Sequence, residues 1–309
     1  MIKQIDREDI IRGCFLGMAC GDALGVGVAP GSPGQTPNTV TQMTGGGPYD
    51  LKPGEWTAPT TQCLCLAESL IKNRGWNAED ILETYQAWYE HGFWSSRDFC
   101  FGMEPALREL VVSRIFSNPI TTPSKDLPNE AGFLSSVAPI SLIYWRDPVK
   151  AMELIEASIA LYLETSICKD LAQYTGLLLY FIIDGKEKKE LFTAGTYLPY
   201  KKWDSAILEL LASDYLEKPF VAHQHPDNPI AVIQAALWSF AQSKNFKDGA
   251  LKAVNLGGQA SIVGALYGQI AGLYYGAQYM PDNWIRSLSY LSALEDIARR
   301  MWRSTLLPS

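Results

Sequence analysis

Apolar residues recur at intervals of three and four along most of the chain, and stretches of strict alternation are few. The first spacing places apolar side chains on one face of an α-helix, whereas alternation would indicate strands. The pattern therefore predicts an all-α fold. Because no low-complexity linker or change in composition divides the chain, we expect residues 1–309 to form a single compact multi-helix domain.

Local signals mark the ends of some helices. Asp147 before Pro148 combines an N-cap residue with Pro at the first helical position, and Asn77 precedes a first turn that contains two acids. Gly92 stands where the second of these helices should stop. Two segments, 28–53 and 117–130, are rich in Pro or Gly and are predicted to be loops, and the first is long enough to suggest a functional or mobile one.

Glycine recurs at every fourth position in one segment near each end of the chain. The two rows are Gly13, Gly17, Gly21 and Gly25, and Gly264, Gly268, Gly272 and Gly276. Residues four apart form a ridge on a helix, and a ridge without side chains lets another helix backbone come very close. Because each Gly within a helix costs about 0.5–1 kcal/mol relative to Ala, we predict that both rows pack at the centre of a helical bundle.

The longest apolar tract, residues 260–279, is long enough to cross a bilayer. It is rich in Gly, contains Gln269 and lacks flanking basic anchors, so we interpret it as a buried helix. The N-terminal segment has no uninterrupted apolar stretch of the kind found in secretion signals, which favours a cytoplasmic protein.

Composition narrows the classes of partner. The net charge is −7 and no Lys/Arg run of the kind that follows a phosphate backbone is present, which argues against a nucleic-acid or anionic-membrane surface. The 6 cysteines are spread along the chain, a pattern typical of free buried thiols and not of a disulfide framework. The 3 histidines, which include His223 and His225, do not complete a zinc site at metal-ligand spacing.

Four segments resemble, in order, the signature regions of the ADP-ribosylglycohydrolase family, which includes the dinitrogenase-reductase-activating glycohydrolase. They are GCFLGMACGDALGVGVAP (13–30), GGGPYDLKPGEWTAPTTQCLCLAESL (45–70), AGFLSSVAPI (131–140) and AVNLGGQASIVGALYGQIAGLYYG (253–276). The resemblance covers nearly the whole chain. It implies an all-α fold with a cleft that holds two magnesium or manganese ions, which bind and activate ADP-ribose linkages.

The acids that the resemblance leads us to expect as metal ligands are replaced in this chain. Where the family reads W-T-D-D-T, the sequence has Trp56-Thr57-Ala58-Pro59-Thr60, and where it reads G-G-D-A-D-T, the sequence has Gly257-Gly258-Gln259-Ala260-Ser261-Ile262. The family's glutamate after G-D-A-L-G falls on Ala29, its F-D-I-G aspartate on Cys100 and its N-G-x-x-M-R arginine on Ser136. Among the family's metal ligands only Thr57 is recognisable.

Loss of these acids changes the expected chemistry. Hard dications need several carboxylate ligands, which a hydroxyl and a few amides cannot replace. We therefore expect no magnesium or manganese pair, no other cofactor and no catalytic residue. The chain is interpreted as a pseudoenzyme that binds an ADP-ribose-like small molecule or a protein partner. The ligand site is expected in the former cleft, at Gly45, Gly46, Gly47, Glu55, Thr57, Thr60, Cys100, Gly257, Gly258, Gln259 and Ser261.

Other interpretations stay open. A divergent hydrolase could use the old cleft without the two metals, through a cysteine nucleophile such as Cys63 or Cys100 or through Glu55 as a general acid beside Trp56. No Lys or His in these motifs would activate a thiol, and an acid at a helix N-terminus is commonly structural. A recruited structural role, or a partner surface formed by aromatic residues such as Trp94, is a further alternative.

Overall fold

The computed structural model describes residues 6–28, 39–116, 131–197, 201–212, 214–218 and 228–306. Within these ranges the regular elements are helices, and an isolated antiparallel bridge joins Gly46 to Leu51. The predicted all-α fold is therefore confirmed. The whole loop predicted at 117–130, residues 29–38 of the loop predicted at 28–53, and both His223 and His225 lie outside the described residues.

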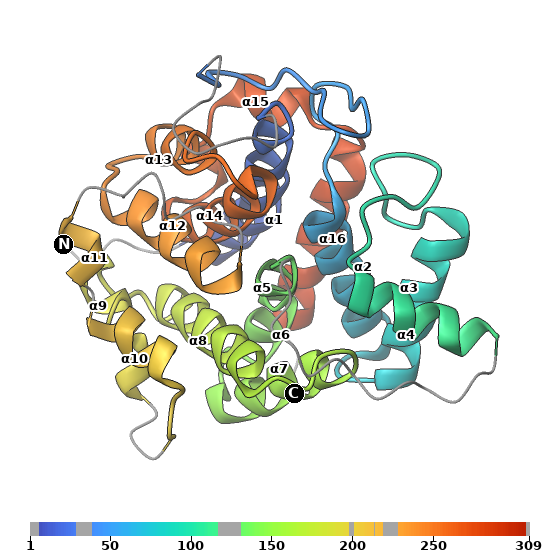
Figure 1. Ribbon diagram of the computed structural model, residues 1–309, viewed down its shortest axis with the longest axis horizontal. Coiled ribbons are helices and arrows are strands. Elements are labelled where there is room, and N and C mark those ends of the chain that lie inside the picture. The colour runs from blue at the N-terminus through green and yellow to red at the C-terminus, as the bar shows by residue number, and fades with distance from the viewer. Residues whose placement is uncertain are drawn as a thin grey trace.

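Figure 1 shows the helices arranged around a central pair, α1 and α14. Their bounds are α1 (Arg7–Gly25), α2 (Ala58–Asn73), α3 (Ala78–His91), α4 (Pro105–Ile115), α5 (Phe133–Ser136), α6 (Ala138–Ile143), α7 (Pro148–Ala160), α8 (Ser166–Ile183), α9 (Lys188–Leu191), α10 (Ser205–Ala212), α11 (Asp214–Glu217), α12 (Pro229–Ala241), α13 (Phe246–Val254), α14 (Ala260–Tyr275), α15 (Asp282–Ser287) and α16 (Leu291–Thr305). Two 3₁₀ turns, η1 (Ala194–Tyr197) and η2 (Ala277–Tyr279), are also described.

The glycine rows meet face to face in the centre of the fold. A Cβ added to Gly17 would lie 2.2 Å from the carbonyl oxygen of Gly268, and a Cβ added to Gly268 would lie 1.9 Å from that of Gly17. The same close approach occurs at Gly13 with Gly272 and at Gly21 with Gly264. This order of pairs makes α1 and α14 antiparallel, with backbone against backbone, and it confirms the prediction for the two rows.

One glycine departs from the prediction. Gly276 does not extend the ridge, because α14 ends at Tyr275 and Gly276 caps it with a φ of 88°. Gly25, at the other end, meets the backbone of Ser261 instead of a glycine. The apolar tract 260–279 is thus a buried helix that stops before its last four residues. Within the described ranges, no helix combines the length and apolarity needed to cross a bilayer.

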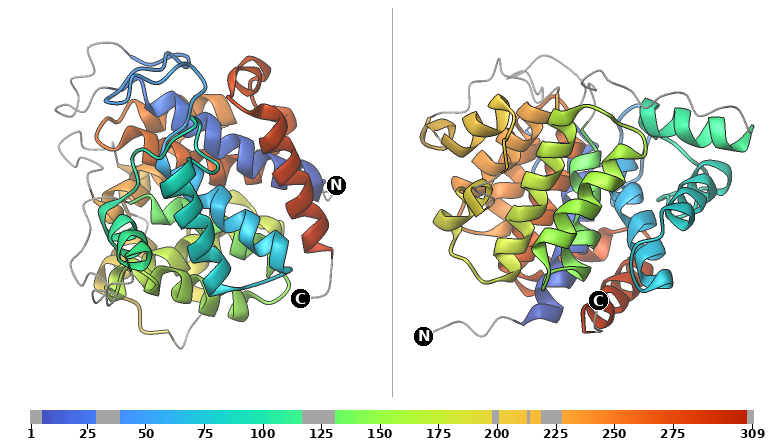
Figure 2. Two further views of the ribbon diagram at one scale, coloured as in Figure 1. Left: turned by 90° about the vertical axis from the view of Figure 1, so that its right-hand side faces the viewer. Right: turned by 90° about the horizontal axis from the view of Figure 1, so that it is seen from below.

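The other helices pack around this pair. α12 and α13 cover one side of α14, α8 packs on α7 and α14, and α16 lies against α1 and α2. Ion pairs between Arg12 and Glu295 and between Arg300 and Glu68 fasten α16 to these two helices. Figure 2 shows α3 and α4 on the outer side of α2.

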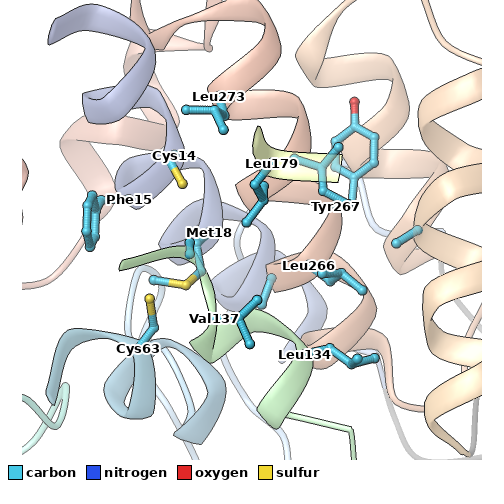
Figure 3. Close-up of a cluster of buried hydrophobic side chains, with 14 of the residues drawn as sticks. Cys14, Phe15, Met18, Cys63, Leu134, Val137, Leu179, Leu266, Tyr267 and Leu273 are labelled. Atoms are coloured by element: carbon cyan, nitrogen blue, oxygen red, sulfur yellow. The ribbon is translucent and has the colours of Figure 1, made fainter. Parts of the chain in front are cut away.

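The central core is apolar and contains free thiols. Figure 3 shows Cys14 and Met18 of α1 near Cys63 of α2, in a cluster of buried side chains that extends to Leu266 of α14. All 6 cysteines are unpaired, which confirms the prediction of free thiols. The helix-end signals are confirmed as well, since Asp147 accepts from the Lys150 amide at 3.0 Å and Gly92 ends α3 in the left-handed conformation.

A Gly268→Ala substitution is expected to lower the free energy of unfolding by about 3 kcal/mol or more, because the added Cβ meets backbone that cannot move aside. Gly176→Ala in α8 is the control, since its Cβ would meet the flexible end of Ile155. We expect that control to change stability by about 1 kcal/mol or less. Chemical denaturation of both variants measures the difference, and equal losses would contradict the central backbone contact.

Candidate functional site

A pocket of about 210 Å³ opens where five chain segments converge. The segments are the end of α1, the loop before α2, the first residues of α2, the residues before α4 and the start of α14. Its described lining consists of Gly25, Val26, Val28, Gly46, Pro48, Tyr49, Leu51, Thr57, Ala58, Pro59, Gly102, Glu104, Gly258, Gln259, Ala260, Ser261 and Ile262.

The glycine contact between α1 and α14 places the pocket. Because the helices are antiparallel, the C-terminal end of α1 lies beside the N-terminal end of α14. A Cβ on Gly25 would lie 2.4 Å from both the Cα and the backbone nitrogen of Ser261. Only a glycine permits this approach, which brings two segments more than 230 positions apart in the sequence to one wall.

Asp22 joins the start of α2 to α1. One carboxylate oxygen accepts hydrogen bonds from the Thr57 backbone amide at 3.0 Å and from the Thr60 hydroxyl at 2.7 Å. The other oxygen accepts a hydrogen bond from the Thr57 hydroxyl at 2.7 Å. Asp22 is fully buried, and burial raises its pKa to about 6 although the threonine hydrogen bonds oppose this shift. The sequence shows Asp22 within the first family segment, but only the tertiary contact reveals that it holds the floor of the pocket.

Arg97 holds the loop that contributes Tyr49 to the lining. Its guanidinium donates to the carbonyl oxygens of Tyr49 at 3.1 Å and Asp50 at 2.5 Å, and to the Glu55 carboxylate at 3.0 Å. Glu55 also accepts from the Lys52 amide at 2.7 Å. These bonds fix the loop that carries Tyr49, which turns tightly because Gly46 has a φ of 101°. Glu55 is therefore a structural anchor of the loop.

The predicted site residues divide into two groups. Gly46, Thr57, Gly258, Gln259 and Ser261 line the pocket together. Gly45, Gly47, Glu55, Thr60, Cys100 and Gly257 are not part of the lining. Thr60 lies below the floor because its hydroxyl points to Asp22, and Glu55 points to Arg97.

The cysteines near the pocket are poor nucleophiles. Burial raises the pKa of the half-buried Cys100 thiol to about 11, although the nearby Arg108 acts in the other direction. Burial also raises the pKa of Cys63 and of Cys65 well above the ordinary value. Since the thiolate is the reactive form, these groups stay protonated and unreactive near neutral pH.

Glu104 lines the pocket with a carboxylate that no sequence motif indicated. Its carboxylate accepts from the Gly132 amide at 2.5 Å and so joins the segment before α4 to the start of α5. In the sequence it is an acid before Pro105, which indicates no more than a helix start. Its closeness to α14 results from tertiary packing.

Charge is sparse in this pocket. Glu104 is the one charged side chain among the described lining residues, which include no Lys, Arg or His. Across the described part of the chain, no group of three or more His, Cys, Asp or Glu side chains is placed to hold a metal ion. Apolar side chains such as Val26, Leu51 and Ile262 form much of the remaining wall.

Comparison with known proteins identifies the class to which this fold and pocket belong. A family profile described as ADP-ribosylglycohydrolase matches residues 3–308, so the chain belongs to the ADP-ribosylglycohydrolase family. A solved structure titled "ADP-ribosylglycohydrolase-related protein complex" superposes with a TM-score of 0.84 at 31% identity, over 97% of this chain and 99% of that one.

Named relatives share about a quarter of their aligned residues with this chain. The chain is 28% identical to the ADP-ribosylarginine hydrolase Tri1 of Serratia proteamaculans, over 98% of this chain and 81% of the relative. It is 25% identical to the ADP-ribosyl-[dinitrogen reductase] glycohydrolase of Rhodospirillum rubrum, over 91% of this chain and 90% of the relative. The family resemblance found in the sequence is thereby confirmed.

An Asp22→Asn substitution is expected to make stability less dependent on pH. The folded-state pKa of about 6 lies above the ordinary 3.8, so the stability that Asp22 contributes is full below about pH 4 and is lost as pH rises through about 6. Relative to the variant, the parent should lose about 2–3 kcal/mol between pH 4 and pH 7. Denaturation at several pH values measures this change. An increase in the parent's free energy of unfolding relative to that of the variant, as pH rises, would contradict it.

Proposed function

We propose that this member of the ADP-ribosylglycohydrolase family is catalytically inactive and binds a nucleotide-like small molecule in the pocket between the starts of α2 and α14. One observation carries the proposal. Ala58, Pro59, Gln259 and Ser261, which stand where the family resemblance leads us to expect acids, all line the same pocket.

The donor set explains why hydrolysis is not expected. Two dications require a ring of oxygen ligands in which carboxylates supply most of the countercharge. The described lining offers the Glu104 carboxylate, the hydroxyls of Thr57 and Ser261 and the amide of Gln259. These groups do not fit a pair of magnesium or manganese ions. Without such ions no Lewis acid polarises the ribose linkage and no metal-bound water is activated.

The preserved pocket supports binding as the remaining role. Ligand pockets in proteins are commonly apolar and carry a small number of well-placed polar groups. This pocket has that character, since Val26, Leu51 and Ile262 surround Thr57 and Ser261. The buried Asp22 anchor and the glycine contact keep its floor in place. A protein partner is the alternative to a small molecule.

One observation favours a second candidate, a divergent hydrolase that works without the metal pair. Glu104 places a carboxylate in the pocket, where it could act as a general acid or base. The relatives named above are hydrolases by name. This candidate requires turnover that is independent of metal and that is lost when Glu104 is changed to Gln.

Calorimetric titration of the protein with manganese is expected to show no saturable site of micromolar affinity. Such affinity corresponds to about −8 kcal/mol and requires several charged ligands. The ADP-ribosylarginine hydrolase of Serratia proteamaculans, titrated in parallel, is the matched control. A micromolar site in the present protein would contradict the proposed loss of the metal centre.

The purified protein is also expected to release no ADP-ribose from ADP-ribosylated arginine, with or without magnesium or manganese. Loss of the metal-held electrostatic arrangement removes the interactions that stabilise the transition state. Release of ADP-ribose is measured chromatographically beside the same control enzyme. Metal-dependent release would reject the proposal, and metal-independent release that the Glu104→Gln variant lacks would establish the second candidate.

A further inference from the structure

We infer that this pocket selects an uncharged ring compound of the nucleoside class and discriminates against its phosphorylated forms. The inference rests on the proposed binding function and narrows its nucleotide-like ligand to the base and sugar without phosphate. Three features of the pocket lead to it: the charge of the lining, the helix N-termini that meet there and an exposed tyrosine.

The lining offers a phosphate no full positive charge. Its described residues include no Lys or Arg, and their one charged side chain is the carboxylate of Glu104. Like charges repel more strongly in a protein pocket than in water, because the effective dielectric constant is lower. A phosphorylated ligand would therefore be penalised where a neutral one is not.

The start of α2 does not replace that missing charge. A helix N-terminus attracts anions through its unpaired amides and its dipole. Here the Thr57 amide already donates to Asp22, and Pro59 has no amide hydrogen to donate. The Asp22 carboxylate thus occupies the position at which a bound phosphate would act. The N-terminus of α14 and the backbone of the neighbouring glycine loop supply partial charges alone.

Tyr49, supported by two further aromatic rings, offers a surface that suits a flat, neutral ring. Tyr49 lines the pocket and 42% of its surface is exposed. Its ring centroid lies 5.0 Å from that of Phe101, which in turn lies 5.8 Å from that of Phe99. Arg97 holds the Tyr49 backbone in place. Offset or tilted packing of a ligand ring against such a group is favourable without any charge.

Neutral polar groups complete the match. Thr57 and Ser261 contribute hydroxyls and Gln259 contributes an amide at the starts of α2 and α14. The Thr57 hydroxyl donates its hydrogen to Asp22, so it faces a ligand as an acceptor. Hydroxyl and amide groups pair with the edges of a nucleobase or with sugar hydroxyls, which are uncharged donors and acceptors.

Titration calorimetry of the unmodified protein with adenosine, AMP and ADP-ribose tests the inference in metal-free buffer. Adenosine should bind, and AMP should bind at least about 10-fold more weakly, which is the penalty expected for one uncompensated charge at short range. ADP-ribose should be weaker than adenosine as well. Binding of AMP or ADP-ribose as tight as that of adenosine, or no binding of adenosine at millimolar concentration, would overturn the inference.

Two variants locate the effect in this pocket. Tyr49→Ala should weaken adenosine binding by about 5-fold or more, as expected for loss of a ring contact. Tyr279→Ala, an exposed tyrosine outside the lining, should leave it unchanged. Glu104→Gln keeps an oxygen for the Gly132 amide but removes the charge, so the gap between adenosine and AMP should narrow. Equal effects of the two tyrosine variants, or an unchanged gap, would count against the inference.

The ligand titrations and the activity assay test the inference and the proposed function separately. Metal-dependent release of ADP-ribose would reject the inactive pocket whatever the order of the three ligands in metal-free buffer. If the protein is inactive yet binds AMP more tightly than adenosine, the proposed function stands and the selection of an uncharged ligand is wrong.

Discussion

The structure depends on the direct contact between the backbones of α1 and α14. At each of three levels along the pair, a glycine of one helix packs against the carbonyl oxygen of a glycine of the other. Side chains at these positions would push the helices apart, because the added atoms would lie within about 2 Å of backbone oxygen. The rows therefore offset the conformational cost of glycine with a contact that no other residue permits. The remaining helices are arranged around this pair.

The same contact determines where the pocket lies. It places Gly25 against Ser261 and so brings the last turn of α1 to the first turn of α14. Asp22, one turn earlier, then fastens Thr57 and the start of α2 to this junction. A buried carboxylate is costly without partners, and three hydrogen bonds from two threonines offset much of that cost. The shape of the pocket thus depends on the packing of α1 against α14 at the centre of the fold.

The residues that hold the pocket are different from those that determine its chemistry. Ala58, Pro59 and Gln259 project into the lining and contribute nothing to the glycine contact. Their side chains can therefore differ among proteins of this fold while the framework persists. This separation explains how the chain can belong to a family of hydrolases and still present a lining in which Glu104 is the one described charge. It also explains why fold similarity alone does not assign an activity to this pocket.

The sequence by itself determined the helical class and the central glycine pair, because periodicity and a four-residue spacing are properties of short segments. It also indicated Gly46, Thr57, Gly258, Gln259 and Ser261, which share the pocket. Tertiary structure decided the rest. The side chains of Glu55 and Thr60 point to Arg97 and Asp22 and do not line the pocket, whereas Glu104 does. A local pattern places a residue on a helix or loop, but the direction of its side chain depends on partners that are distant in sequence, and those are fixed only when the helices pack.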